Sequence, residues 1–133
     1  MERQVAGEQI AQLLGLEQPK PTPPKTYFLR IKVTACSPDD PKDRAYYASH
    51  GYEGATYNIA ADYRYFPKGT KIRVPGYLEQ SYPGKFWEVD SKGGSVIRRS
   101  SNQGNPQIDV KFTTYYSARN WGTKWLDVEI MLP

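Results

Sequence analysis

The sequence predicts a mostly-β domain, a small barrel of about six strands preceded by an N-terminal arm that is helical or extended. At 133 residues the chain has the length of one domain, and its 38% hydrophobic and 24% charged residues suit a packed core. The chain also has 11 Tyr and 3 Trp, residue types that favour strands and can stack on sugar rings. Short apolar segments separated by turn residues complete the pattern of an all-β fold.

The N-terminal residues differ in composition from the rest. Apolar residues recur at roughly helical spacing over 5–16, which predicts a short helix. Four prolines follow within 19–24. Because proline cannot continue a helix, residues 17–25 are expected to form an extended, semi-rigid linker. We therefore divide the chain into an N-terminal arm with its Pro-rich linker, 1–25, and a barrel domain, 26–133.

The strands are predicted from apolar alternation and from the turn residues between them. At 28–33 the apolar residues Leu29, Ile31 and Val33 alternate with basic ones, as in a half-buried strand. Residues 36–58 are rich in Pro, Asp, Gly and Tyr and are expected to be a long loop. The remaining expected elements are strands at 71–74, 86–90, 95–97, 108–112 and 125–131, a polar loop at 100–106, and one or two helical turns at 117–121.

Charge and rare residues narrow the classes of function. The net charge of +4 favours acidic partners, but Lys and Arg form no stripe, so nucleic acid is not expected as a partner. The single cysteine, Cys36, allows neither an intrachain disulfide nor a Cys-x-x-Cys zinc site, and the single histidine, His50, excludes a histidine-rich metal site. No run of about 18 apolar residues could span a membrane, and no signal peptide is visible. We expect a monomer with no cofactor and no metal.

Two acidic residues stand out because they lie in predicted strands, where aspartate is disfavoured. In 108–112 the apolar residues occupy one face, which puts Asp109 on the other face together with Lys111. The same alternation in 86–90 places Asp90 opposite the apolar side chains. A solvated surface position is the alternative for each acid.

Further motifs extend over 34–132. In chain order they are Thr34-Ala35; Ala61-Asp62 with Phe66-Pro67-Lys68-Gly69-Thr70-Lys71; Val89-Asp90-Ser91-Lys92-Gly93-Gly94; Ile108-Asp109-Val110; and Ala118 with Trp121-Gly122, Val128 and Ile130. Together they resemble the motifs of the 3D domain family, which is named for three aspartates and is shared with membrane-bound lytic transglycosylase A and other bacterial cell-wall enzymes. The chain departs from the family pattern in three places: Tyr63 follows Asp62 instead of proline, an extra residue separates Asp90 from Gly93, and residues 98–104 form an insertion.

The resemblance implies a double-psi β-barrel and a lytic transglycosylase. Such an enzyme cleaves the β-1,4 bond between N-acetylmuramic acid and N-acetylglucosamine without water and leaves 1,6-anhydro-N-acetylmuramic acid ends. The resemblance makes Asp109 the catalytic acid and base, with Asp62 and Asp90 orienting it. Because one carboxyl group donates and then accepts a proton, a pKa near neutrality suits it, and neighbouring carboxylates would raise its pKa. Peptidoglycan glycan strands are the implied partner, and the bacterial cell envelope or extracellular space is the implied location.

Other residues near these motifs receive supporting roles. The candidate substrate-binding residues are Thr70, Lys68, Gly93, Gly94, Lys111 and Tyr115. The turn at 67–70 is interpreted as the start of a strand, and Trp121 as a core residue. Acids outside the motifs are interpreted as turn formers or as the solvent face of the last strand; they are Asp39, Asp40, Asp43, Asp127 and Glu129.

Three alternatives to a lytic transglycosylase stay open. The first is a non-catalytic barrel that binds glycan. The second is a glycoside hydrolase in which two carboxylates activate water. The third is a cation site, because three aspartates can supply the oxygen ligands that Ca²⁺ or Mg²⁺ prefers.

Overall fold

The computed structural model describes residue 15 and residues 25–41 and 56–131. The predicted helix at 5–16 lies outside the described residues except for Gly15, and so do His50, Asp43 and most of the Pro-rich linker. No helix in the described ranges is long and apolar enough to cross a membrane.

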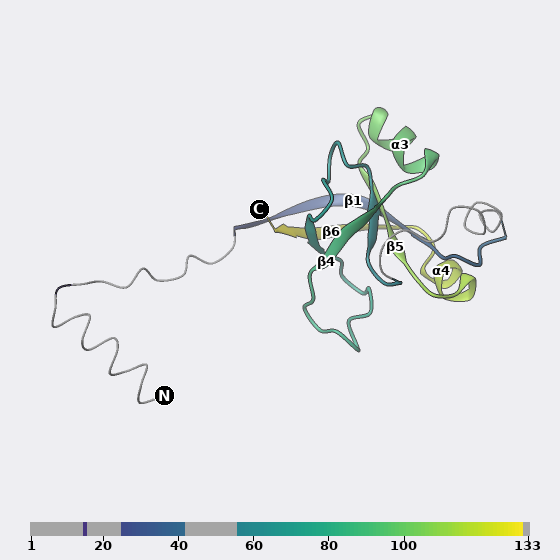
Figure 1. Cartoon of the computed structure of the whole chain (residues 1–133), viewed down its shortest axis with the longest axis horizontal. Helices are drawn as coiled ribbons and strands as arrows, with labels where there is room; N and C mark the ends of the chain where they lie inside the picture. Colours follow the sequence, from purple (N-terminus) through teal and green to yellow (C-terminus); the bar gives the residue numbers. More distant parts are fainter. Residues whose placement is uncertain (1–14, 16–24, 42–55, 132–133) are drawn as a thin grey trace.

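Six strands close into a barrel (Figure 1). Around the barrel the order is β1-β5-β2-β4-β3-β6. The β1–β5 and β2–β4 pairs are parallel, and the other neighbours are antiparallel. The prediction of a mostly-β barrel of about six strands is therefore confirmed. The strands are β1 (Thr26–Cys36), β2 (Ile59–Ala61), β3 (Lys71–Arg73), β4 (Trp87–Lys92), β5 (Gln107–Lys111) and β6 (Lys124–Met131).

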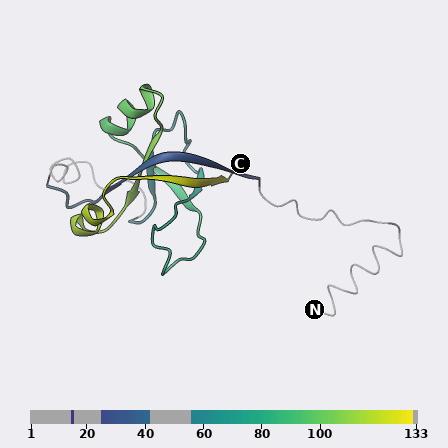
Figure 2. The ribbon, with the colours of Figure 1, turned by 180° about the vertical axis from the view of Figure 1, so that it is seen from behind.

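The longest strand pair is a two-stranded ribbon. β1 and β6 lie side by side (Figure 2) and pair from Thr26 with Met131 to Val33 with Lys124. The predicted alternation of β1 holds, because Ile31 and Val33 are fully buried while their neighbours are more exposed. The structure extends this strand to Cys36, which lets its second half also pair with β5.

The hydrophobic core fills the barrel and contains both aliphatic and aromatic side chains. Buried aliphatic residues come from every strand, among them Ile59, Ile72, Val89, Ile108 and Val128. Hydrophobic burial of this kind is the main favourable term in folding. The predicted core role of Trp121 is confirmed. This residue ends helix α4 (Tyr115–Trp121), its ring lies 6.2 Å from that of Tyr77, and its indole N–H donates to the Val33 carbonyl at 3.2 Å.

The prediction of a strand at 95–97 is wrong. This segment begins a helix, α3 (Ser95–Asn102), which also takes in the start of the expected loop at 100–106. Gly94 adopts an extended N-cap conformation, and the helix then buries Ile97 and Ser101, one turn apart, on the same face. A run of three residues is too short for apolar periodicity to separate a helix from a strand.

Strand β2 (Ile59–Ala61) has no counterpart among the predicted strands. All three of its residues are buried, so it shows no alternation between apolar and polar side chains. It lies between β4 and β5 and pairs with both. Strand β2 therefore lies between the two strands that carry Asp90 and Asp109.

Candidate functional site

The three predicted aspartates lie on or directly after three neighbouring strands of the barrel, β4, β2 and β5. Asp109 occupies the middle of β5, opposite Thr34 of β1 on one side and Ala60 of β2 on the other. Asp62 is the first residue after β2. Asp90 lies on β4 where the pairing with β2 slips by one residue, since Ile59 pairs with Val89 but Ala60 pairs with Ser91. Asp90 is thus the extra residue of a bulge, a feature that redirects a side chain.

A chain of hydrogen bonds holds Asp109. The Thr34 hydroxyl donates to the Asp109 carboxylate, and Gln107 Nε2 donates to the Thr34 hydroxyl at 2.8 Å. The Ser100 hydroxyl, from helix α3, donates to Gln107 Oε1 at 2.8 Å. Gln107 is almost fully buried, so this chain is fixed within the fold. Asp109 itself is half-buried and alternates along β5 with the fully buried Ile108 and Val110.

Asp90 takes part in a buried ion pair with Lys111. The Lys111 ammonium lies 2.5 Å from Asp90 Oδ1 and 2.7 Å from the Ser91 hydroxyl. Asn58 Nδ2 donates to the second Asp90 oxygen at 3.0 Å. The Lys111 and Asp90 side chains are only 1% and 10% exposed. Lys111 was predicted to bind substrate from the Asp109 face of β5. In the structure its ammonium group is instead buried against the Asp90 carboxylate.

Asp62 is held by a different cation. Arg64 approaches it through two nitrogens, with Nη2 2.6 Å from Oδ2 and Nε 3.0 Å from Oδ1. The Arg64 backbone N–H also donates to Asp62 Oδ1 at 3.0 Å, an Asx-type turn. Arg64 in turn donates to Asn102 of α3 at 2.7 Å. The side-chain hydrogen bond from Arg64 lowers the pKa of Asp62, so Asp62 is a carboxylate at neutral pH.

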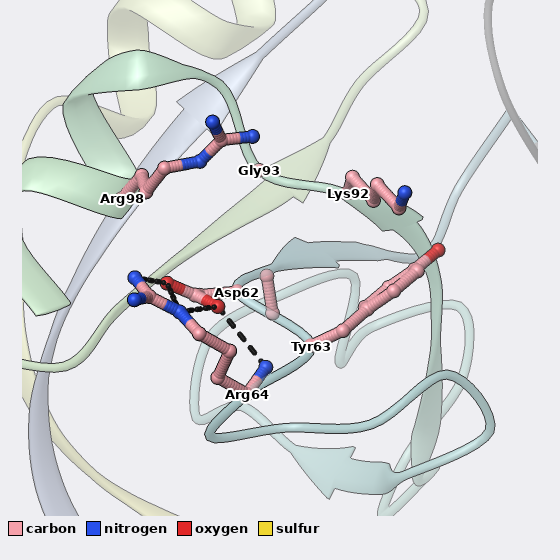
Figure 3. A pocket seen from close by; sticks show the side chains of 7 residues that line it. Asp62, Tyr63, Arg64, Lys92, Gly93 and Arg98 are labelled. Carbon is pink, nitrogen blue, oxygen red and sulfur yellow. Dashed lines mark hydrogen bonds and ion pairs between the residues drawn. The ribbon is translucent and has the colours of Figure 1, made fainter.

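A pocket of about 460 Å³ opens beside Asp62 (Figure 3). Asp90 and Asp109 are not among the residues that line it. Arg98 reaches it from α3, and Lys92 comes from the end of β4. The lining residues are Ala61, Asp62, Tyr63, Arg64, Lys92, Gly93 and Arg98.

The glycine pair after β4 has a structural role in joining β4 to β2 and to α3. Gly93 donates its backbone N–H to the Ala61 carbonyl at 2.8 Å, which joins the ends of β4 and β2. A Cβ on Gly93 would lie 2.6 Å from Cγ2 of Ile97, a buried side chain of α3. Only glycine therefore lets α3 pack this close. Gly94 follows as the N-cap residue of α3.

The other predicted substrate-binding residues lie at separate places. Thr70 closes the turn that leads into β3, as predicted, and its hydroxyl donates to the Pro67 carbonyl at 2.6 Å. Lys68 is exposed on the same turn. This turn adjoins Asp90 along β4, because Gly69 donates to the Val89 carbonyl at 2.8 Å. Tyr115 begins α4, beyond the carboxyl end of β5.

The acids of the last strand stand on its outer side, as predicted. Asp127 is exposed and lies 3.3 Å from Arg30 across the β1–β6 ribbon. Glu129 accepts hydrogen bonds from Thr26 at 2.8 Å and from Arg73 at 3.0 Å, and these bonds lower its pKa. Within residues 25–41 and 56–131, no three His, Cys, Asp or Glu side chains are grouped to hold a metal ion.

Several residues of the candidate site are not predicted from the sequence. Arg64 had a local signal, because an aspartate at the end of a strand commonly forms a turn with the backbone two residues on. Gln107 and Ser100 lacked such a signal, since their bond depends on how α3 packs against β5. Arg98 was not predicted as a site residue, because residues 95–97 were predicted to be a strand and are instead the start of α3.

The chain matches no protein-family model, and comparisons with curated proteins and with solved structures find no match. The resemblance to the 3D domain family therefore stays a prediction, and so do the roles that it implies.

The ion pair of Asp62 should make stability depend on pH. Since Arg64 lowers the folded-state pKa of Asp62 below its unfolded value of about 3.9, the pair stabilises the fold above that pH and ceases to do so as pH falls through the folded-state pKa. The advantage of the wild type over Asp62→Asn in urea unfolding should thus be constant near neutrality and shrink below about pH 4. The effect should be small, because the Arg64 side chain is 57% exposed. An advantage that grows toward acid pH would contradict this.

Proposed function

We propose that the barrel is a peptidoglycan lytic transglycosylase domain in which Asp109 is the catalytic acid and base. The contact between Thr34 and Asp109 carries the proposal. These two residues are 75 positions apart and belong to separate motifs of the resemblance, Thr34-Ala35 and Ile108-Asp109-Val110. They pair across β1 and β5, and the threonine donates to the carboxylate.

Two further motifs, those of Asp62 and Asp90, lie on or directly after β2 and β4, the strands that follow β5 around the barrel. The segments that contain Asp62 and Asp90 follow or form β2 and β4, which are hydrogen-bonded through Gly93 and Ala61. Ala61 pairs with Ile108, the residue before Asp109. This spatial grouping of residues far apart in the sequence supports the proposal.

The proposed reaction needs a single proton carrier. Asp109 in its acid form protonates the glycosidic oxygen, and the carboxylate so formed takes the proton from the C6 hydroxyl of the muramyl residue as that oxygen attacks C1. The C1–O bond to the leaving sugar breaks, a 1,6-anhydro ring forms, and Asp109 ends protonated for the next cycle. The bonds from Gln107 to Thr34 and from Thr34 to Asp109 keep the carboxyl group in one orientation throughout.

The ion pairs change the electrostatics expected from three aspartates. Asp62 is paired with Arg64, and Asp90 with Lys111, so the charge of each is offset by a nearby cation. Each paired carboxylate thus differs from the unpaired anion that the resemblance leads one to expect. In this proposal their task is to shape and anchor the β2–β4 end of the site.

The same ion pairs favour a second candidate, a barrel that binds glycan without cleaving it. Paired carboxylates and a pocket rich in cations are features of a recognition surface as much as of a catalytic one. This candidate keeps the same partner, the peptidoglycan strand. For either function we propose a monomer that acts in the bacterial cell envelope or outside the cell.

Incubation of the full chain with purified peptidoglycan, followed by mass spectrometry of the soluble products, tests the proposal. We expect muropeptides that end in 1,6-anhydro-N-acetylmuramic acid, because the C6 hydroxyl replaces water as the attacking group. Reducing-end muramic acid would identify a hydrolase instead. Retention of the protein on the insoluble strands with no product would identify a binding module.

A further inference from the structure

The pocket beside Asp62 is lined by more cationic than anionic side chains. Its lining contains three cationic side chains, Arg64, Lys92 and Arg98, and one carboxylate, Asp62. Asp62 is already bound by Arg64 through two nitrogens. Figure 3 shows Arg98 and Lys92 on the far side of the pocket from this pair. A second anion entering the pocket would therefore meet a net positive lining.

The walls of the pocket add to this preference. Helix α3 begins at Ser95, with Gly94 as its N-cap residue, and its first turn has no acidic residue and no side-chain cap. The amino end of a helix carries a partial positive charge. On the opposite wall the Tyr63 ring lies 5.8 Å from the Lys92 ammonium, which gives the pocket an aromatic face beside its cations. Such a face can contact the apolar side of a sugar or of a short aliphatic group.

The pocket also lies next to the candidate acid. Ala61 lines it and pairs with Ile108, which precedes Asp109 in β5. A ligand whose glycosidic bond reached Asp109 could thus place a neighbouring substituent here. The volume of about 460 Å³ is within the range of pockets that hold small organic ligands, about 300–1,000 Å³, and exceeds what a bare ion needs.

We propose that this pocket binds the carboxylate carried by the muramyl residue of the glycan, through Lys92 and Arg98, while Asp62 holds Arg64 in place. In peptidoglycan that carboxylate belongs to the lactyl group or to the peptide attached to it. Arginine suits the role because its guanidinium can form two parallel bonds to one carboxylate. The inference rests on the proposed function for the identity of the ligand, and it assigns the pocket as the element that distinguishes muramyl residues from neutral sugars.

The test measures binding, separately from cleavage, in the Asp109→Asn background so that the strands stay intact. One ligand is a glycan strand freed of its peptides, in which the lactyl carboxylates are exposed. The second is the same strand after its carboxylates are coupled to methylamine, which removes the charge and keeps the sugar backbone. The variant is Lys92→Gln/Arg98→Gln. The matched control is Arg99→Gln, which removes the same charge from the adjacent residue of α3, outside the pocket lining.

We expect the double variant to raise the Kd for the charged strand about tenfold and to leave the Kd for the neutralised strand within about twofold. Arg99→Gln should change neither Kd by more than about twofold. The charge-retaining variant Lys92→Arg/Arg98→Lys should recover most of the affinity, which guards against a loss caused by misfolding. The contrast between wild type and double variant should also shrink as salt is added.

Three results would overturn the inference, and they can be told apart. If charged and neutralised strands bind equally to every variant, the protein binds glycan but not through this pocket, and the proposed function survives. If neither strand binds, both the pocket ligand and the glycan partner are wrong. If inorganic phosphate competes with the strand at concentrations where acetate does not, the pocket selects phosphate and the carboxylate assignment fails.

Discussion

Replacement of Asp109 by asparagine should remove nearly all cleavage of peptidoglycan, with the rate falling by about 10²–10⁴-fold. Asparagine keeps the shape of the side chain, and its oxygen can still accept the hydrogen bond from Thr34. What it lacks is an ionisable group that donates and then accepts a proton. The rate is measured as release of 1,6-anhydro products by mass spectrometry, at equal concentrations of folded protein.

Asp127→Asn is the matched control for this change. Asp127 is also a strand aspartate, but it is exposed on β6 and contacts Arg30. Its replacement should leave cleavage unchanged. Binding of intact strands should survive in Asp109→Asn, because the fold and the pocket beside Asp62 are retained. Full activity of Asp109→Asn would show that another residue carries the proton, and Asp90 would then be the next acid to replace.

Replacement of Lys111 by methionine should lower the free energy of unfolding by about 3–5 kcal/mol. Methionine fills much of the volume of the lysine stem but removes the ammonium that lies 2.5 Å from Asp90. The Asp90 carboxylate, 10% exposed, then loses its cation in a place where water cannot fully replace it. The loss is measured by urea unfolding near neutral pH.

The partner variants distinguish this mechanism from a simple packing defect. Asp90→Asn leaves the Lys111 charge buried opposite a neutral amide and should also destabilise the protein. The double variant Asp90→Asn/Lys111→Met leaves no buried charge and should be more stable than the sum of the single changes predicts. Lys71→Met, at an exposed position of β3, should change stability by no more than about 0.5 kcal/mol. A loss below about 1 kcal/mol for Lys111→Met would contradict the role assigned to the ion pair.

Much of the barrel follows from local pattern. The alternation of β1 and the short apolar segments of β5 and β6 predicted those strands to within a few residues. The predicted turn before β3 and the core position of Trp121 were also correct. The positions of two elements could not be predicted from apolar alternation. β2 is buried throughout and has no alternation, and α3 begins with three residues that suit a strand as well as a helix.

The candidate site was predicted only in part. Alternation correctly placed Asp109 and Lys111 on the same face of β5, since a strand has a period of two residues. It did not predict that Lys111 would be buried against Asp90. That contact depends on the bulge between β2 and β4, where one extra residue redirects the Asp90 side chain.

The sequence by itself determined the fold class, the position of most strands and the face of β5 that carries Asp109, because these depend on residues close together in the chain. Only the tertiary structure decided the partner of each aspartate: Thr34 for Asp109, Lys111 for Asp90 and Arg64 for Asp62. It also decided that Arg98 shares a pocket with Asp62. Most of these contacts join residues far apart in the sequence, and they form only when strand order, register and the packing of α3 bring them within hydrogen-bond distance. A pattern of residue types along the chain does not contain that information.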